Sequence, residues 1–419
     1  MKTICVTGGK PLRGSVRTSG SKNAALALLP AALLATGETV LENVPHIGDI
    51  RTMEQLLNAL GVRARSMPDG RMTVDATHIE TYDAPYDLVK KMRASFCVAG
   101  PLLARLGRTR VPLPGGCDIG ARAVDYHIKG MEALGAEVRI EHGYVEAAAE
   151  RLRGAVILLD TPSVGATCHI ITMACLAEGT TVIQNAAEEP EVVDLANFVN
   201  AMGGAVRGAG TSTVEVDGVK GLRGCAYRVI PDRMEAGSYA IAGAATRGSV
   251  RVTGCNPEHL SAVLAKLVEA GVEVTTGPDW IHVSAHTRPR ALTVRTLPYP
   301  GFPTDMQQPL TSLLTTADGT SVVTETIYER RFRHLDELRQ MGAVIRLEGQ
   351  SAIITGVERL TGARVTATDL RAGAAMIIAG LMAYGRSEIT GVEHIERGYE
   401  DVVGKFSALG AEISFGESE

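Results

Sequence analysis

The chain has few aromatic residues and no excess of positive charge. Among its 419 residues, aromatic side chains make up 4% and only one is tryptophan, whereas apolar residues make up 45%. A chain of this length has room for two domains, and cores of alanine, valine and leucine account for the composition. The net charge of −5 argues against a polyanion-binding surface, so we expect no nucleic-acid partner, including any repeat-built nucleic-acid clamp.

Paired cysteines and long apolar runs are also missing. The seven cysteines include no CxxC pair, which favours reduced thiols over a disulfide framework, and no zinc pattern is present. The longest apolar stretch, 24–35, contains Pro30 and is too short to span a bilayer, and the first residues have no signal-peptide core. We therefore expect a cytoplasmic protein with no membrane partner and no bound metal.

A glycine-rich loop, LPGGCDIGAR at 113–122, is the most unusual local feature. It places the thiol of Cys117 five residues before the guanidinium of Arg122, among three glycines. Glycines supply the unusual backbone angles of loops that close over ligands. We predict that Cys117 is a reactive thiol rather than a core residue.

A repeat of about seventy residues runs along the chain. Amphipathic segments end on glycines that are 68 to 74 residues apart: Gly61, Gly135, Gly203, Gly271, Gly342 and Gly410. Apolar segments end on an interleaved set: Gly37, Gly107, Gly179, Gly248, Gly319 and Gly385. A left-handed glycine ends many helices, and the β-branched residues that follow predict strands. The spacing predicts six units of strand, apolar helix, strand, loop, amphipathic helix and strand.

Six units suggest two domains of three. The first helix of each unit is apolar nearly all round and should be buried, whereas the second should lie nearer solvent. The segment 4–14 resembles the strands that open units at 214–224 and 353–362. We therefore expect a first domain at 20–229, which carries the Cys117 loop, and a second formed by 1–19 plus 230–419. The predicted fold class is α/β.

Polar residues gather at two equivalent places in the repeat. The starts of the buried helices carry Lys22 with Asn23, Lys90 to Arg93, Ser163 to Gly165, Arg233 with Glu235, Asp305, and Asp369 with Arg371. The other loops carry Asp49, Arg122 and Asp125, Glu188 to Glu191, Glu329 to Arg331, and Arg397. Helix starts bind anions, so the pattern favours a small, multiply anionic substrate. Taken singly, Ser163 and Asp305 are typical of plain N-caps.

These residues together resemble the enolpyruvyl transferase family over essentially the whole chain. The motifs that carry the resemblance are SGSKNAAL at 19–26, PYDLVKKMRAS at 85–95, LPGGCDIGAR, PSVGAT, NAAEEPEVVDLANF, VIPDRMEAG, PGFPTDMQ, ATDLRAGAA and HIERGYE. The resemblance implies two inside-out α/β barrel domains, with helices within and sheets outside.

The resemblance also implies a reaction. Its branch with a cysteine-bearing loop transfers the enolpyruvyl group of phosphoenolpyruvate to the 3-hydroxyl of UDP-N-acetylglucosamine, releasing inorganic phosphate through a tetrahedral intermediate. This is the first committed step of peptidoglycan synthesis in cell-wall formation. Cys117 resembles the general acid, and Asp305 resembles the residue that takes the hydroxyl proton. No metal or organic cofactor is implied.

Substrate contacts carry over by resemblance, with Lys22 and Arg397 also in the catalytic set. Expected phosphoenolpyruvate-binding residues are Lys22, Asn23, Arg122, Arg371 and Arg397. Expected UDP-N-acetylglucosamine-binding residues are Arg93, Arg122, Val124, Asp125, Tyr126, Ser163, Val164, Asp305 and Ile327.

The chain departs from the family pattern near the nucleotide. Ala123 and Tyr126 stand where the pattern has proline and leucine, and Thr161 replaces a basic residue of some members. These differences bear on nucleotide affinity rather than on reaction type. Two alternatives stay open: a 3-phosphoshikimate 1-carboxyvinyltransferase, against which the cysteine-bearing loop weighs, and a catalytically silent nucleotide-sugar-binding paralogue. The sequence does not indicate an oligomeric state.

Overall fold

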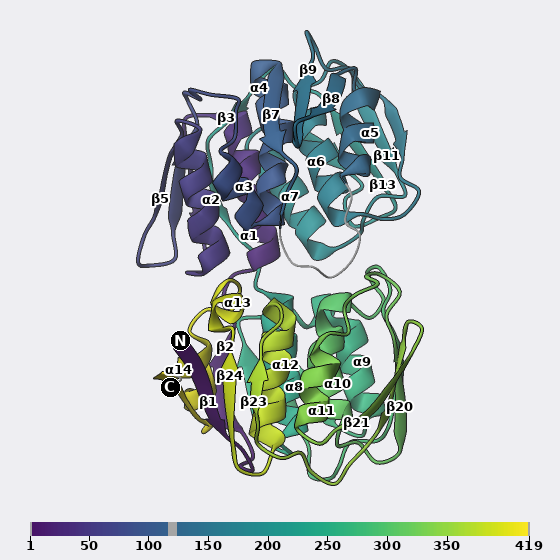
Figure 1. The fold of residues 1–419 in the computed structure, drawn as a ribbon. Helices are drawn as coiled ribbons and strands as arrows, with labels where there is room; N and C mark the ends of the chain where they lie inside the picture. Colours follow the sequence, from purple (N-terminus) through teal and green to yellow (C-terminus); the bar gives the residue numbers. More distant parts are fainter. Residues whose placement is uncertain (1, 116–123, 418–419) are drawn as a thin grey trace. The chain divides into compact units, whose positions relative to one another are not determined.

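The chain forms two compact units in a computed structural model that describes residues 2–115 and 124–417 (Figure 1). The first unit comprises the described residues from 20 to 230, and the second comprises 2–19 together with 231–417. The chain passes from the second unit to the first after Ser19 and returns after Ile230. Cys117, Arg122 and Ala123 lie outside the described residues.

The strands of the first unit are short, and most have five residues or fewer. They are β3 (Ala35–Thr36), β4 (Glu38–Glu42), β5 (Arg63–Ser66), β6 (Met72–Asp75), β7 (Arg108–Pro112), β8 (Glu137–Glu141), β9 (Tyr144–Ala148), β10 (Val156–Leu158), β11 (Thr180–Gln184), β12 (Ala205–Arg207), β13 (Thr213–Asp217), β14 (Leu222–Arg223) and β15 (Ala226–Arg228). Their sheets have the orders β15-β4-β6-β5, β7-β9-β8 and β10-β11-β13-β12, with a small β14-β3 pair.

The strands of the second unit include two from the N-terminus. They are β1 (Lys2–Thr7), β2 (Arg13–Arg17), β16 (Ser249–Thr253), β17 (Glu273–Thr276), β18 (Trp280–Ser284), β19 (Thr293–Arg295), β20 (Thr320–Thr324), β21 (Val344–Glu348), β22 (Ser351–Thr355), β23 (Arg364–Thr366), β24 (Arg386–Thr390) and β25 (Glu412–Glu417). Their sheets have the orders β17-β18-β16-β2, β19-β20-β22-β21 and β23-β24-β1-β25. Strand β1 thus lies between β24 and β25, with Ile4 opposite Ile389 and Phe415.

One pairing pattern recurs in these sheets. In each four-stranded sheet, an edge strand runs parallel to its neighbour and the remaining pairs are antiparallel, as in β19, β20, β22 and β21. The three-stranded sheet has the parallel pairing in reduced form: Asp83 makes an isolated parallel bridge to Arg110 on β7. The repeat predicted from the glycine spacing is therefore confirmed.

Each repeat contributes a buried helix and a second helix. The buried helices are α1 (Lys22–Ala31), α4 (Ala99–Leu106), α6 (Val164–Ala174), α8 (Arg233–Ala245), α10 (Gln307–Leu314) and α12 (Leu370–Met382). The second helices are α2 (Gly48–Ala59), α5 (Asp125–Ala133), α7 (Pro190–Ala201), α9 (Ser261–Glu269), α11 (His334–Gln340) and α14 (Val402–Ala408). Shorter helices are η1 (Ala32–Leu34), α3 (Tyr86–Lys91), η2 (Arg93–Val98), η3 (Pro257–Leu260), η4 (Thr304–Met306) and α13 (Val392–Glu396).

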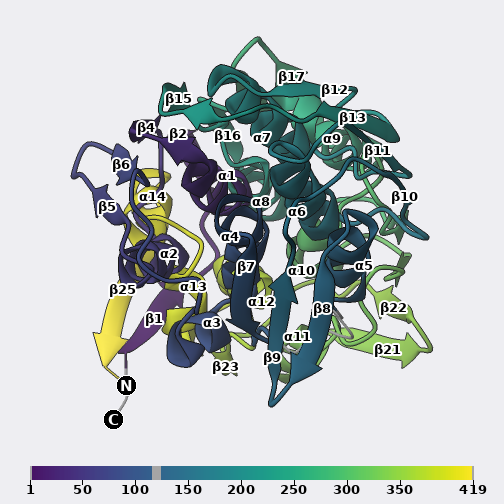
Figure 2. The ribbon, with the colours of Figure 1, turned by 90° about the horizontal axis from the view of Figure 1, so that it is seen from above.

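The helices lie inside and the sheets outside in each unit. Every residue of α8 and α10 is buried, and each unit has one apolar core built around its central helices. Figure 2 shows α1, α4 and α6 of the first unit toward the middle of the ribbon, with β5, β9 and β11 around them. Helix α7 is more buried than expected for a second helix, because Glu191 and Asp194 are buried with its apolar residues.

The glycines that end the second helices have the predicted geometry. Gly61, Gly135, Gly203, Gly271, Gly342 and Gly410 all have φ between 85° and 100°. The interleaved set also has positive φ, with one exception. At Gly248 the prediction was wrong, because the left-handed residue is Arg247, with φ of 54°. Gly248 is needed for space instead, since a Cβ there would lie 2.1 Å from the carbonyl oxygen of Leu12.

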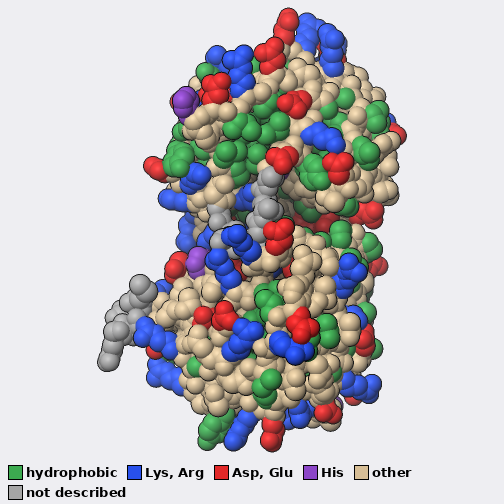
Figure 3. Space-filling model, turned by 45° about the vertical axis from the view of Figure 1, so that its right-hand side comes forward, with side chains coloured by type: hydrophobic (Ala, Val, Ile, Leu, Met, Phe, Trp, Pro, Cys, Tyr) green, Lys and Arg blue, Asp and Glu red, His purple; other side chains and the backbone are tan. Residues whose placement is uncertain are grey.

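The surface is mixed in charge. Figure 3 shows acidic and basic side chains interspersed over the face in view. Within 2–115 and 124–417, the structure has no helix that is both long enough and apolar enough to cross a membrane.

Candidate active site

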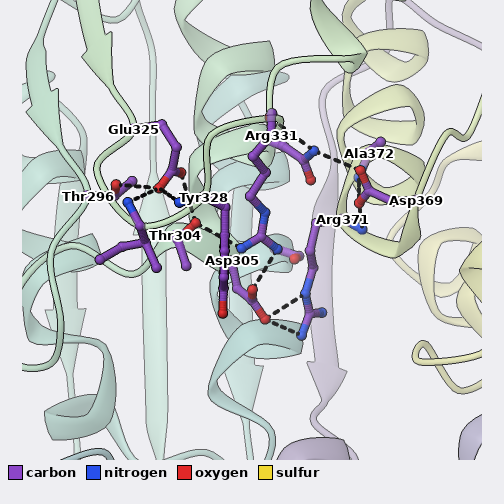
Figure 4. A network of polar contacts seen from close by, with 12 residues as sticks. Thr296, Thr304, Asp305, Glu325, Tyr328, Arg331, Asp369, Arg371 and Ala372 are labelled. Atoms are coloured by element: carbon purple, nitrogen blue, oxygen red, sulfur yellow. Dashed lines mark hydrogen bonds and ion pairs between the residues drawn. The ribbon is translucent and has the colours of Figure 1, made fainter. Parts of the chain in front are cut away.

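Asp305 lies between two buried arginines in the second unit (Figure 4). Its Oδ1 accepts a hydrogen bond from Nη2 of Arg331 at 2.6 Å, and its Oδ2 accepts bonds from Nη2 and Nε of Arg371 at 3.1 and 3.2 Å. The arginine side chains are 4% and 3% exposed, whereas the Asp305 side chain is 24% exposed. The carboxylate is therefore held from within and remains accessible.

Asp305 is not a helix cap. It is the middle residue of η4, whose N-cap position is Pro303, so the N-cap interpretation of Asp305 was wrong. Both of its carboxylate oxygens accept hydrogen bonds from guanidinium groups. Two positive charges this close strongly stabilise the charged carboxylate.

Arg331 links Asp305 to the loop that contains Ile327. Its Nη1 donates to Oγ1 of Thr304 at 2.8 Å, and the same hydroxyl donates to Oε2 of Glu325 at 2.8 Å. Oε1 of Glu325 accepts the backbone N–H of Ile327 at 2.8 Å. Burial alone lowers the pKa of Arg331, but the Asp305 and Asp369 carboxylates raise it, and the net shift is upward. Ile327, an expected nucleotide contact, is thus fixed by the network that holds Asp305.

Arg371 is the second residue of α12 and is held by its helix start. Asp369 caps α12, accepting the N–H groups of Arg371 and Ala372 at 2.8 and 3.0 Å. Nη1 of Arg371 also donates to the hydroxyl of Tyr399 at 3.2 Å. Burial lowers the pKa of Arg371, yet Tyr399 and Asp305 raise it, and the net shift is upward. The guanidinium therefore stays charged.

Lys22 begins α1 in the first unit and has a buried partner. Its Nζ lies 2.9 Å from Oδ2 of Asp49, with side chains 13% and 3% exposed. Ser21 caps the same helix, accepting the N–H of Ala24 at 3.2 Å. This cap holds Lys22 at the first turn of α1, next to the half-buried Asn23.

The starts of α5 and α6 hold several expected nucleotide contacts. Ser163 caps α6, accepting the N–H of Ala166 at 3.4 Å, as the N-cap interpretation predicted, and Val164 is the first residue of that helix. At the start of α5, Val124 is buried and Asp125 is exposed. The hydroxyl of Tyr126 lies 3.1 Å from Oγ1 of Thr161.

Two further expected contacts stand at element ends. Arg93 begins η2 and is half-buried. Burial, together with the charge of Arg93, lowers the pKa of His127 to about 3. Arg397 follows α13 and is half-buried. Cys117 and Arg122 lie outside the described residues, so their roles stay predictions.

Sequence analysis did not identify the partners that hold the site residues. Arg331, Glu325 and Tyr399 were not among the predicted site residues, although Glu329 to Arg331 had been noted at a repeat-equivalent loop. The signal available for Arg331 was this loop position, and for Tyr399 the HIERGYE motif. Among the described residues, no group of three or more His, Cys, Asp or Glu side chains is arranged to hold a metal ion.

Comparison with known proteins decides the family. The sequence model of the EPSP synthase (3-phosphoshikimate 1-carboxyvinyltransferase) family matches residues 6–406. The chain belongs to this family. The resemblance inferred from the motifs is therefore confirmed.

Members of the family with known names are similar over the full length. The UDP-N-acetylglucosamine 1-carboxyvinyltransferase of Clostridium botulinum is 52% identical over 99% of both chains. The protein named UDP-N-acetylglucosamine 1-carboxyvinyltransferase 3 of Caldanaerobacter subterraneus is also 52% identical, again over 99% of both chains.

Solved structures share the fold. The enolpyruvyl transferase NikO from Streptomyces tendae has a TM-score of 0.90 at 26% identity, covering 99% of this chain and 98% of its own. An EPSP synthase from Acinetobacter baumannii has a TM-score of 0.75 at 18% identity over the whole of both chains, a likeness of fold alone. The predicted fold of two α/β barrel domains built from six repeats is thus confirmed.

Proposed function

We propose that this protein transfers the enolpyruvyl group of phosphoenolpyruvate to the 3-hydroxyl of UDP-N-acetylglucosamine, releasing inorganic phosphate. The observation that carries the proposal is the 52% identity, over 99% of the chain, to proteins named for that activity. With this activity the protein would be a transferase of peptidoglycan synthesis, and it would act in the cytoplasm. The six described cysteines are all free, as suits a reducing compartment.

The chemistry needs a base and an acid acting together. The sugar oxygen forms a bond to the central carbon of phosphoenolpyruvate while its proton passes to Asp305. The methylene carbon takes a proton from Cys117, giving a tetrahedral phospho-ketal. The methyl group then loses a proton to the Cys117 thiolate, and phosphate departs with the bonding electron pair and takes the proton from Asp305, which leaves the enolpyruvyl ether. No metal or organic cofactor enters these steps.

The structure supports Asp305 as the base through its exposure and charge. Its two arginine partners donate hydrogen bonds to both carboxylate oxygens, and the carboxylate stays partly exposed. Protonated Asp305 would give its proton back readily, since the neutral acid loses the attraction of the arginines. Such reversibility suits a site that runs addition and then elimination.

The proposed phosphoenolpyruvate site includes two cations, Lys22 and Arg371, that are held by partners in the structure. Lys22 and Arg397 would bind the phosphate together with Arg122 and Asn23, and Arg371 would bind the carboxylate. Arg371 already holds Asp305 and Tyr399. A guanidinium has five N–H donors, so Arg371 can hold these two groups and a substrate carboxylate together.

The nucleotide sugar would be bound by the remaining predicted contacts. These are Arg93, Arg122, Val124, Asp125, Tyr126, Ser163, Val164, Asp305 and Ile327. Those at the starts of α5 and α6 present backbone N–H groups and hydroxyls, which suit a diphosphate.

Release of inorganic phosphate from phosphoenolpyruvate tests the proposal. It should be measured with UDP-N-acetylglucosamine, with shikimate 3-phosphate and with no acceptor. We expect release with the nucleotide sugar alone. Release with shikimate 3-phosphate would favour the other carboxyvinyl transfer, and release with none, together with tight nucleotide-sugar binding, would favour a silent paralogue.

A covalent label tests the role of Cys117 separately. An epoxide of the fosfomycin type reacts with an accessible thiolate, so we expect it to label Cys117 and none of the six described cysteines. Burial raises the pKa of Cys97 and Cys255 to about 11 and that of Cys175 to about 12. Peptide mass mapping that finds the label on another cysteine would contradict the assignment.

A further inference from the structure

The guanidinium group of Arg371 holds Asp305 and Tyr399 through different nitrogens. Asp305 accepts from Nε and Nη2 (Figure 4), whereas the Tyr399 hydroxyl accepts from Nη1 at 3.2 Å. These bonds use three of the five N–H donors of a guanidinium. Within the described residues, one N–H on each terminal nitrogen is therefore left for a ligand.

A second buried hydroxyl lies behind Tyr399. The Tyr399 oxygen lies 2.8 Å from Oγ of Ser238 on α8. Ser238 Oγ in turn donates to the carbonyl oxygen of Met234, one turn earlier in α8, at 2.8 Å. Arg371, Tyr399 and Ser238 are each at most 4% exposed, so solvent competes little for these bonds.

Every proton in this chain of bonds has an acceptor when the bonds run in one direction. Arginine cannot accept, so Tyr399 accepts from Arg371, and among the described residues Ser238 is the acceptor for the Tyr399 proton. Ser238 has a single proton, which it donates to the carbonyl of Met234. Burial raises the pKa of Tyr399, so the phenol keeps its proton. The order is thus Arg371, Tyr399, Ser238 and the backbone of α8.

Glycines let the elements that carry these side chains pack closely. A Cβ on Gly373 in α12 would lie 2.3 Å from Cγ1 of Ile395 in α13, the helix just before Tyr399. A Cβ on Gly237 in α8 would lie 2.5 Å from Sδ of Met306 in η4. Close packing therefore holds the helices, and the hydrogen bonds fix the side chains between them.

We propose that Tyr399 is a positioning residue for the transfer reaction and that Ser238 acts through it. By holding Nη1, Tyr399 sets the plane of the Arg371 guanidinium. One edge of that group then faces Asp305, and the remaining N–H groups receive the carboxylate of phosphoenolpyruvate. In this role neither hydroxyl contacts the substrate. The identity of the substrate rests on the proposed function, whereas the chain of bonds rests on the geometry.

Removing the two hydroxyls singly and together tests the proposal. Tyr399→Phe keeps the ring and releases Nη1, so we expect the KM for phosphoenolpyruvate to rise about tenfold and kcat to fall about tenfold. Ser238→Ala should change both constants about threefold in the same directions. The double variant should behave as Tyr399→Phe does, because Ser238 acts only through the phenol.

The two substrates distinguish positioning from a general loss of structure. The KM for UDP-N-acetylglucosamine should stay within about twofold of the parent in all three variants, because Arg371 is not among its expected contacts. A loosened fold would instead affect both substrates and lower the unfolding temperature. Tyr239→Phe is the matched control, since it removes the hydroxyl of a buried tyrosine next to Ser238 on α8. It should leave the constants for both substrates unchanged.

Direct binding of phosphoenolpyruvate separates the positioning role from the proposed function. Calorimetry should give a Kd for phosphoenolpyruvate about tenfold higher in Tyr399→Phe than in the parent. A parent that binds phosphoenolpyruvate but releases no phosphate with UDP-N-acetylglucosamine would contradict the proposed function. The change in Kd would still support the positioning role in that case.

Four results would overturn the positioning role. They are phosphoenolpyruvate constants in Tyr399→Phe equal to those of the parent, equal effects on the two substrates, a double variant whose losses multiply, and a parent that binds no phosphoenolpyruvate. If Tyr399→Phe does not fold, Ser238→Ala decides the question. An unchanged KM for phosphoenolpyruvate in folded Ser238→Ala would then contradict the proposal, and a selective threefold rise would support it.

Discussion

The starts of α10 and α6 occupy equivalent places in the repeat but carry opposite chemistry. Just before α10, Asp305 is bound by the buried guanidinium groups of Arg331 and Arg371. At the start of α6, Ser163 caps the helix and Thr161 bonds to Tyr126, with no charge in the bonds. The repeated backbone supplies the start of a buried helix in both places. The side chains then decide whether that position presents a carboxylate held by cations or neutral hydroxyl groups.

A second carboxylate shows what the arginines do. Asp194 on α7 is buried, and its oxygens accept bonds from the hydroxyl of Tyr227 at 2.7 Å and the N–H of Ile230 at 3.3 Å. Burial raises the pKa of Asp194 to about 6 despite those bonds. Neutral donors therefore do not offset the loss of solvent at Asp194, whereas Asp305 has two cations and is partly exposed. The comparison supports the proposal that Asp305, rather than Asp194, acts as the base.

The largest effect is expected from removing the charged carboxylate. Asp305→Asn should lower kcat about 10³-fold, because the amide cannot take the hydroxyl proton. Phosphate release measures the loss, and calorimetry with UDP-N-acetylglucosamine checks that the protein still binds its acceptor. Asp336→Asn, at an exposed carboxylate paired with Arg339, serves as the matched control and should keep full activity. A kcat within tenfold of the parent in Asp305→Asn would remove the base role.

A smaller loss is expected at the charged helix start of the first unit. Lys22→Met should lower kcat/KM for phosphoenolpyruvate about 100-fold, because a phosphate-binding cation is lost. It should also lower the free energy of unfolding, since Asp49 is left buried without this partner. Lys266→Met, which removes the half-buried partner of the exposed Glu269, is the control. Unchanged phosphoenolpyruvate kinetics in Lys22→Met would show that this ion pair is structural only.

Asp194 should make stability depend on pH. Its folded pKa of about 6 lies above the ordinary aspartate value of 3.8 because of burial, so the folded state holds the proton more tightly than the unfolded state. The resulting stabilisation is complete below about pH 4 and is lost as the pH rises through 6, a change of about 3 kcal/mol. Asp194→Asn should remove this slope when unfolding is followed in urea from pH 4 to 7. A slope equal to that of the parent would contradict the shift.

The smallest effect is expected at the neutral helix start. Ser163→Ala removes the α6 cap and should cost about 1 kcal/mol in the free energy of unfolding. The kcat should stay within a few-fold of the parent, because no charge is lost. Ser407→Ala on α14, where the hydroxyl does not cap a helix, is the control. A loss of kcat comparable to that of Asp305→Asn would show that the neutral start is part of the chemistry.

Sequence alone predicted the repeat and the fold class because their signals are local. A glycine with positive φ at a helix end and an apolar helix can be recognised within a few residues, as at Gly135 and α8. The prediction was wrong at Gly248, where the glycine is required by the carbonyl of Leu12, more than 230 residues away in the chain. A constraint that comes from a distant segment leaves no local pattern.

The same difference between local and distant signals applies to the candidate site. The motifs indicated Asp305, Arg371 and Lys22 as chemically important, but not which side chains hold them. Arg331 reaches Asp305 from a loop 26 residues away, and Tyr399 reaches Arg371 across 28 residues. The N-cap prediction held at Ser163 and was wrong at Asp305, because two arginines from elsewhere in the fold compete for the Asp305 oxygens.

The most direct test of the account is the mass spectrum of the nucleotide sugar after reaction with phosphoenolpyruvate in heavy water. Addition turns the methylene carbon into a methyl group that takes a solvent deuteron, and elimination then removes one of its three hydrogens. If addition and elimination both occur, we expect an enolpyruvyl ether of UDP-N-acetylglucosamine with deuterium in its vinyl group. Unchanged UDP-N-acetylglucosamine, or an ether without deuterium, would contradict it.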